Sequence, residues 1–210
     1  INAYTSKEVT AYYARVLEAD VPLAMDVIGD IVLNPLFEPK EIETERGVIL
    51  QEIGQALDTP DDVIFDWLQE EAYPDQPLGR TILGPSDKVS TFSRDDLSGF
   101  VAEHYGPERL ILSAAGGVDH DAIVCEAEVL FGHLKPFAEF THAPGSFATG
   151  ERREFKALEQ VHFALGLESP GYQSDDIYTA QIFSTAFGGG MSSRLFQEVG
   201  EKRGLCYTIY

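Results

Sequence analysis

The sequence has little cysteine and little positive charge. Its two cysteines, Cys125 and Cys206, are too few for a disulfide framework and do not form the C-x-x-C pair of a metal-binding knuckle. The 210 residues contain 15 Lys and Arg but 35 Asp and Glu, which gives a formal net charge of −20 at pH 7. Because so acidic a surface repels phosphate groups, we expect neither nucleic acid nor anionic membrane surfaces among the partners.

Long apolar runs are also missing. No stretch approaches the roughly 20 residues that a membrane-spanning helix needs, so we expect no membrane span. No basic segment followed by an apolar one marks a signal peptide, and the compartment stays open, with the cytoplasm favoured over the periplasm. Because the chain starts without Met and ends inside an expected strand, we expect it to be part of a longer protein.

Several catalytic motifs are absent as well. The sequence has no G-x-S-x-G nucleophile motif, and the Gly run at 188–190 lacks the Lys and Ser of a phosphate-binding loop. No two of the five histidines stand four residues apart, as two zinc-binding histidines on one helix face often do. The chain alone therefore predicts no closed zinc site.

What the sequence does contain is a series of helical patterns. Apolar residues at helical spacing, with prolines or acids in the first turn, predict six helices. They span 21–35, 39–57, 60–73, 93–105, 119–134 and 174–187. Ser93 and Ser174 are the predicted N-caps, and a further helix is expected from about Ser192, with Gly204 as its C-cap.

Strands are expected where β-branched and aromatic residues gather. They span 8–17, 109–118, 159–170 and the last residues of the chain. Strands and helices in this alternation predict an α+β sandwich. A stretch at 135–150 with Pro and Gly and no periodicity is expected to link a domain over 1–134 to a second one over 151–210.

The segment "ETERGVILQEIG" at 43–54 holds candidate metal-binding side chains. Glu45 and Glu52 stand seven residues apart, which is two helical turns, so both carboxylates lie on one face of the expected helix. A solvated acidic surface would show the same spacing. The pattern by itself leaves both interpretations open.

Four segments in order along the chain resemble the M16 peptidases, and most of all the bacterial relatives of the mitochondrial processing peptidase β subunit. They are "NAYTSKEVTAYYARVL", "EIETERGVILQEI", "LGRTILGP" and "FGGGMSSRLFQEVGEKRGLCYTI". The matches run from Asn2 to Tyr207 and so cover nearly the whole chain. This resemblance implies a two-layer sandwich of mostly antiparallel sheet with helices on one face, followed by a second, similar domain that is incomplete.

The resemblance also implies a zinc centre. Family members bind zinc through an H-x-x-E-H motif and a downstream glutamate in the pattern E-R-x-V-I-x-x-E. Here that pattern runs from Glu45 to Glu52, which makes Glu52 the third zinc ligand and Glu45 a supporting acid. The H-x-x-E-H motif would precede Ile1, so the chain alone is not expected to cleave peptides. In the intact site, zinc lowers the pKa of a bound water and the glutamate of the motif acts as general base.

Substrate contacts are implied in the same way. The strand holding Asn2, Ala3 and Tyr4 would take up the substrate peptide as an added strand through main-chain hydrogen bonds. Asp62 and Asp66, four residues apart on one helix face, would accept an arginine near the cleavage site. A solvated acidic face is the alternative for this second pair.

The family places an arginine and a tyrosine seven residues apart near the substrate. Tyr207 matches the tyrosine, but Gly200 stands where the arginine is expected. This difference weakens the expected clamp on the substrate.

Together these patterns predict part of a zinc-dependent M16 endopeptidase that hydrolyses extended peptides. The intact protein is expected to form a homodimer or a heterodimer with a paralogue. Two alternatives remain: a non-catalytic scaffold or partner subunit that lacks H-x-x-E-H, and a free-standing peptide-binding module. The residues preceding Ile1 distinguish the peptidase from the scaffold.

Overall fold

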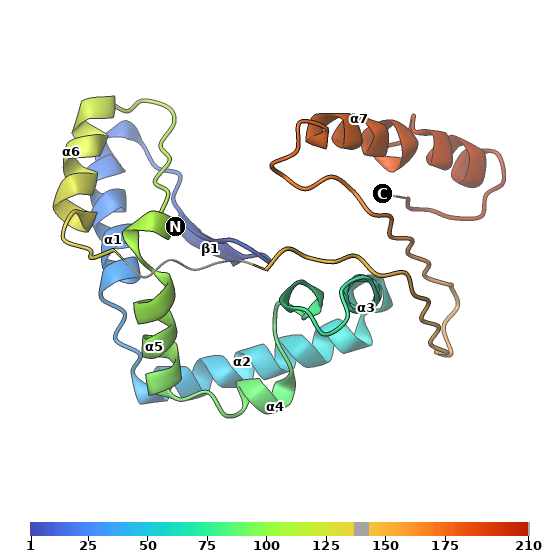
Figure 1. Cartoon of the computed structure of the whole chain (residues 1–210), viewed down its shortest axis with the longest axis horizontal. Coiled ribbons are helices and arrows are strands. Elements are labelled where there is room, and N and C mark those ends of the chain that lie inside the picture. The colour runs from blue at the N-terminus through green and yellow to red at the C-terminus, as the bar shows by residue number, and fades with distance from the viewer. Residues whose placement is uncertain (137–142, 210) are drawn as a thin grey trace. The chain divides into compact units, whose positions relative to one another are not determined.

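The computed structural model describes residues 1–136 and 143–209, and the chain divides into two compact units, Ile1–Ala164 and Leu165–Tyr210 (Figure 1). Part of the predicted linker, residues 137–142, lies outside the described residues. The predicted domain boundaries at 134 and 151 therefore stay a prediction. Each unit is described separately below.

A β-hairpin opens unit 1. Strand β1 (Asn2–Thr5) pairs antiparallel with β2 (Thr10–Tyr13), with Asn2 opposite Tyr13 and Thr5 opposite Thr10. The N–H of Ser6 donates to the carbonyl of Val9 at 2.7 Å and closes the turn. The β-branched and aromatic residues of the two strands favour an extended backbone. The strand predicted over 8–17 is thus confirmed for its central part.

The helices agree closely with the predicted ranges. The long ones are α1 (Val21–Leu33), α2 (Pro39–Asp58), α3 (Pro60–Ala72), α5 (Arg94–His104), α6 (His120–Phe131) and α7 (Ile177–Gly188). Shorter helical segments are Glu18–Asp20, Pro77–Gly79, α4 (Ser86–Val89), Pro107–Arg109 and the π-helix Phe196–Glu201. Pro39 and Pro60 occupy first helical positions, where a missing N–H costs no hydrogen bond.

The predicted strands at 109–118, 159–170 and the chain end are not formed. The sheet of the described residues consists of β1 and β2 alone. Ile111 is 93% exposed and Val161 94% exposed, so their side chains have no covering layer. Composition indicates a preference for extended backbone, but a strand exists only when a second one pairs with it.

The helix caps are partly as predicted. The Ser93 hydroxyl accepts from the N–H of Asp96 at 3.2 Å, and the Asp96 carboxylate accepts from the N–H of Ser93 at 2.8 Å, which is a reciprocal capping box. The N-cap of α7 is Asp176 and not Ser174; the Ser174 hydroxyl instead accepts from the N–H of Asp176 at 3.2 Å. The C-cap of the π-helix is Lys202 and not Gly204, which follows two residues later in the left-handed conformation with φ +60°.

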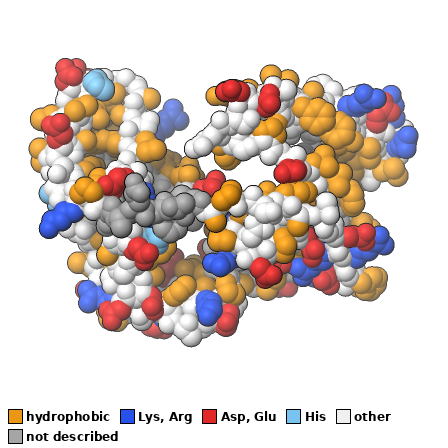
Figure 2. Space-filling model, viewed as in Figure 1, with side chains coloured by type: hydrophobic (Ala, Val, Ile, Leu, Met, Phe, Trp, Pro, Cys, Tyr) orange, Lys and Arg blue, Asp and Glu red, His pale blue; other side chains and the backbone are white. Residues whose placement is uncertain are grey.

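The hydrophobic core is thin. Its buried side chains come from four helices of unit 1 and are Met25, Val32, Ile53, Val63 and Val89. Helix α1 packs on α6 through Gly29, where an added Cβ would lie 3.3 Å from Leu130. Many large apolar side chains remain exposed, and Figure 2 shows them in orange on its visible face.

Polar contacts add to this packing in unit 1. The Arg46 guanidinium on α2 donates to the carbonyl of Phe92 at 2.8 Å and also to the carbonyl of Val89. The hydroxyls of Tyr12 and Tyr105 lie 3.2 Å apart and join the hairpin to the end of α5. Burial, with this hydrogen bond, raises the pKa of Tyr105 to about 12. The hairpin is therefore fixed to the helical part of unit 1.

Replacing Ser93 by Ala removes the side chain that caps α5. We expect the melting temperature to fall by about 2–4 °C, because the N–H of Asp96 loses its acceptor. Thermal unfolding followed by circular dichroism measures the change. Ser98→Ala is the matched control, since the Ser98 hydroxyl only donates back to the carbonyl of Asp95 within α5.

The same cap gives a pH dependence. Hydrogen bonds from Ser93 hold the pKa of Asp96 below its usual value, so their stabilisation is present above the usual Asp pKa and is lost as the pH falls through the lowered one. The difference in melting temperature between Ser93→Ala and the wild type should become smaller in strong acid. Equal melting temperatures at neutral pH would contradict this role of Ser93.

Candidate functional site

The candidate metal-binding carboxylates lie on α2. Glu45 and Glu52 are both exposed, and the unbroken helix between them sets them two turns apart on one face, as predicted. Glu43 points to the opposite face and accepts from Arg46 at 3.1 Å. Within the described parts of the chain, no three His, Cys, Asp or Glu side chains come close enough to hold a metal ion. Glu52 suits zinc as one carboxylate ligand, but these residues do not complete a site.

The candidate peptide-binding edge is β1. Asn2, Ala3 and Tyr4 are exposed, and among the described residues β2 is the strand that pairs with β1. The Asn2 side-chain oxygen accepts from the N–H of Ala3 at 2.8 Å. The Tyr4 ring packs against Tyr13 with a centroid distance of 6.2 Å. Among the described residues no other strand covers the outer edge of β1, so this edge is accessible to an added strand.

The acidic face of α3 carries Asp62, Asp66 and Glu70, one helical turn apart. Asp62 and Glu70 are exposed, whereas Asp66 is half-buried. Burial raises the pKa of the Asp66 carboxyl, the nearby Lys7 ammonium opposes this, and the charges of Glu70 and Asp62 reinforce it. Ionisation of the Asp66 carboxyl is therefore less favourable in the folded state than in the unfolded chain.

Lys7 joins the hairpin to the segment that follows α3. It is in the turn between β1 and β2, and its ammonium donates to the carbonyl of Arg80. It also acts electrostatically on Asp66. The two predicted substrate-binding features, β1 and the Asp62–Asp66 pair, thus belong to neighbouring parts of unit 1. This neighbourhood cannot be predicted from local sequence patterns, because about sixty residues separate Lys7 from Asp66.

A segment expected to be a free linker is docked on α3. The N–H of Ala148 donates to the carbonyl of Ala72 at 2.8 Å. The Gln76 side-chain amide donates to the carbonyl of Ser146 at 2.9 Å and accepts from its N–H at 2.8 Å. Just beyond the predicted linker, at the start of the predicted second domain, the Arg152 guanidinium bonds Glu70 at 2.8 Å. Composition alone missed these contacts, because each depends on a partner far away in the sequence.

Unit 2 holds the remaining predicted residue. Tyr207 is 90% exposed, and Gly200 lies in the π-helix, where an added Cβ would be 3.6 Å from the carbonyl oxygen of Cys206. Lys202 bonds Glu198 at 2.6 Å. Its hydrogen bond and charge, with the charges of Arg203 and Arg194, hold the pKa of Glu198 below its usual range. Lys202, Arg203 and Arg194 thus all act on an acid of their own unit.

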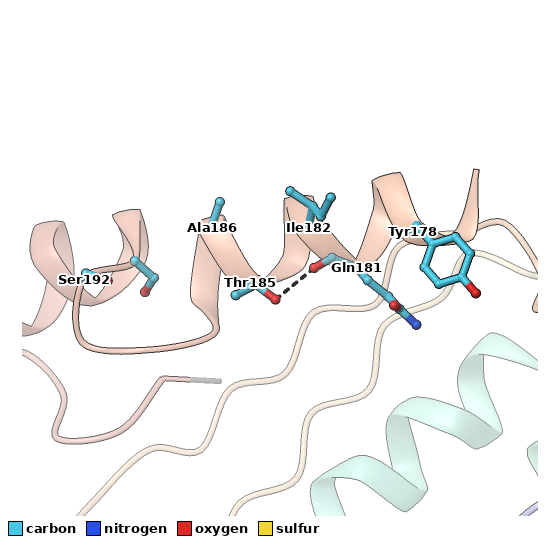
Figure 3. A pocket seen from close by; sticks show the side chains of 7 residues that line it. Tyr178, Gln181, Ile182, Thr185, Ala186 and Ser192 are labelled. Atoms are coloured by element: carbon cyan, nitrogen blue, oxygen red, sulfur yellow. Dashed lines mark hydrogen bonds between the residues drawn. The ribbon is translucent and has the colours of Figure 1, made fainter. Parts of the chain in front are cut away.

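An open hollow of about 620 Å³ also lies in unit 2 (Figure 3). It is lined by Tyr178, Gln181, Ile182, Thr185, Ala186, Ser192 and Ser193. Figure 3 shows the hydrogen bond from the Thr185 hydroxyl to the carbonyl of Gln181, which is 2.9 Å long and only local. No sequence pattern marks these residues as a site, because apolar positions at helical spacing are typical of a packed helix face.

Two known protein families match this chain over nearly its whole length. Residues 1–86 match the family described as insulinase (peptidase family M16), and residues 91–210 match the peptidase M16 inactive domain. The chain belongs to the M16 peptidase family. The family resemblance predicted from four sequence motifs is therefore confirmed.

Relatives of this M16 chain support the assignment. An uncharacterized zinc protease of Rickettsia felis is 44% identical over 99% of the chain, and the match covers 51% of that protein. A solved protease from Helicobacter pylori is similar in fold, with a TM-score of 0.77, 21% identity, and coverage of 96% of this chain and 51% of that one.

A chain of complex III2 from Candida albicans shares the fold as well, with a TM-score of 0.70, 17% identity, and coverage of 96% of this chain and 51% of that chain. The M16 chain thus spans about half the length of the relatives it matches. Within its described residues, no helix is both long and apolar enough to cross a lipid bilayer.

Replacing Asp66 by Asn tests its environment. Because the pKa of Asp66 is raised on folding, its charge destabilises the native state at neutral pH, and this penalty disappears as the pH falls through the raised value. We expect Asp66→Asn to raise the melting temperature at pH 7 by about 1–2 °C, a gain that fades towards pH 4.

Asp62→Asn serves as the control, since it removes the same charge from an exposed position of the same face. It should change the melting temperature less than Asp66→Asn. A clear loss of stability in Asp66→Asn at pH 7 would contradict the account of this carboxylate.

Proposed function

We propose that the protein containing this chain is a zinc-dependent endopeptidase that hydrolyses peptide bonds in extended peptides. The observation that carries this proposal is Glu52, exposed on an unbroken helix within the pattern E-R-x-V-I-x-x-E, in a chain of the M16 family. Relatives described as zinc proteases support it. Since the chain spans about half of those relatives, the activity is proposed for the whole protein.

Glu52 would supply one zinc ligand, and Glu45, two turns earlier on the same face, would support the site through hydrogen bonding. The two histidine ligands and the general base are expected from an H-x-x-E-H motif outside residues 1–210. When bound, zinc would supply an activated water for attack on the scissile carbonyl. The contribution of this chain is the carboxylate and the helix that fixes its direction.

The substrate would bind in unit 1 at β1 and α3. An extended peptide can pair with the edge at Asn2, Ala3 and Tyr4 through main-chain hydrogen bonds, which depend little on its sequence. Asp62 and Asp66 would then recognise an arginine side chain by bidentate, charge-assisted bonds. The electrostatic effect of Lys7 on Asp66 supports this arrangement, because it shows that the hairpin turn lies near the acidic face. We include Tyr207 as a further substrate contact on family resemblance alone.

The two-layer sandwich is part of the same proposal. Val161, Phe163, Leu165 and Leu167 alternate with less exposed neighbours, and each is at least 71% exposed. This alternation is typical of a strand with one apolar face. We infer that 109–118 and 159–170 join sheets whose other strands lie outside residues 1–210.

A non-catalytic scaffold or partner subunit is the second candidate. The likeness to a chain of complex III2 favours it only at the level of the fold. A homodimer or a heterodimer with a paralogue would fit either candidate. The residues that precede Ile1 separate the two, because the scaffold would lack H-x-x-E-H.

Replacing Glu52 by Gln in the full-length protein tests the metal site. The amide removes the negative oxygen that binds zinc, so we expect the affinity for zinc to fall at least tenfold and chelator-sensitive peptide cleavage to disappear. Zinc affinity by competition with a chromogenic chelator and cleavage of a fluorogenic peptide measure both effects. Glu45→Gln should have a smaller effect on each.

Glu43→Gln is the matched control, because it removes one carboxylate from the opposite face of the same helix. It should leave zinc affinity unchanged. If Glu52→Gln bound zinc and cleaved peptide like the wild type, the assignment of Glu52 would be wrong.

Replacing Asp62 and Asp66 together by Asn tests substrate recognition. We expect cleavage of a peptide with arginine near the cleavage site to slow about tenfold or more, and that of a matched glutamine peptide to change little, because only arginine uses the charges. Values of kcat/KM for the two peptides give the comparison. Equal slowing of both peptides would count against arginine recognition at this face.

A further inference from the structure

Residues 143–156, here called the strap, follow α3 closely. At one end, Phe147 packs edge-on against Tyr73 at 6.2 Å, and Gly150 comes so near that an added Cβ would lie 2.7 Å from the Glu71 carboxylate. At the other end, the Lys156 ammonium donates to the carbonyl of Leu57 at 2.7 Å. The strap is thus held from the loop after α3 to the end of α2.

Arg152 makes the most elaborate contact of the strap. Its guanidinium bonds Glu70 at 2.8 Å and Glu154 at 3.2 Å, and it lies over the Trp67 ring with 4.6 Å to the ring centroid. Two ion pairs and a cation–π contact hold the planar group in one orientation. The acidic face of α3 therefore already binds one guanidinium, that of its own chain.

This contact divides the acidic face. Glu70 is engaged by Arg152, while Asp66 and Asp62 lie one and two turns nearer the start of α3, respectively. The charged groups that act on Asp66 are Lys7 from the hairpin turn and Asp62 and Glu70 from α3. Arg152 engages the Glu70 carboxylate in an ion pair, which leaves Asp62 and Asp66 as the pair without that partner, while the charge of Glu70 still raises the pKa of Asp66.

We propose that Arg152 is a positioning residue that sets specificity: it withdraws Glu70 from the acidic face, so that Asp62 and Asp66 receive the arginine side chain of a peptide. The inference rests on the proposed arginine recognition. A guanidinium is matched in shape by two carboxylates, whereas a lysine ammonium is a point charge that responds to all the negative charge nearby. Loss of the ion pair between Arg152 and Glu70 would therefore strengthen the binding of a lysine side chain more than that of an arginine side chain.

The test compares peptide binding by the full-length protein and its Arg152→Met variant. Fluorescence anisotropy with three labelled peptides, identical except for Arg, Lys or Gln at one position, gives the Kd values. We expect Arg152→Met to bind the lysine peptide about two- to fivefold more tightly and the other two nearly as before, so that the preference for arginine over lysine falls.

Two further variants separate specificity from folding. Arg152→Lys keeps the charge beside Glu70 and should retain most of the preference. Adding Glu70→Gln to Arg152→Met removes the freed carboxylate and should restore the preference for arginine over lysine. If all three peptides weakened together in Arg152→Met and Glu70→Gln restored nothing, Arg152 would be a structural anchor only and the inference would be wrong.

The outcomes also separate this inference from the proposed function. A wild type that binds the arginine and glutamine peptides equally would overturn arginine recognition and this inference with it. A wild type that prefers arginine, with an unchanged preference in Arg152→Met, would overturn the role of Arg152 alone. Binding that follows the prediction in a protein without peptidase activity would support Arg152 and contradict the peptidase.

Discussion

The charge balance on α3 is the interaction on which the candidate substrate site depends. Three carboxylates, Asp62, Asp66 and Glu70, would repel one another along one helix face. Two cations from distant segments offset this repulsion: Lys7 from the hairpin turn and Arg152 from the strap. The ion pair of Arg152 holds the strap against α3, and the charge of Lys7 acts on the same helix face from the hairpin turn, so the electrostatics of one helix also organise the surface around it.

The geometry of α2 sets a different constraint. An unbroken helix directs Glu45 and Glu52 to one face, but a helix of this sequence can supply only carboxylates there. Zinc needs further ligands, and the described residues offer no cluster that provides them. We propose Glu52 as one such ligand because its helix lies within the part of the chain that matches the M16 family, and we propose an H-x-x-E-H motif outside residues 1–210 as the source of the histidines.

The sequence predicted the local features well and the distant contacts poorly. Helices α1 to α3 and the Ser93 cap depend on residues within a few positions of one another, which a pattern can reveal. The expected strand at 159–170 depends on a partner strand, and the docking of the strap depends on Glu70 and Gln76. Neither partner is visible from local composition. Likewise, Ser174 was mistaken for the N-cap because two further polar residues, Asp175 and Asp176, follow it before α7 begins.

The central claim is that the protein is a zinc peptidase to which this chain contributes one metal ligand. The most direct measurement is the metal content of the full-length protein, determined by mass spectrometry together with peptide cleavage before and after chelation. The account predicts one zinc ion per chain, loss of cleavage when the zinc is removed, and recovery when zinc is returned. A folded protein that cleaves peptides without bound zinc, or that binds none at all, would contradict it.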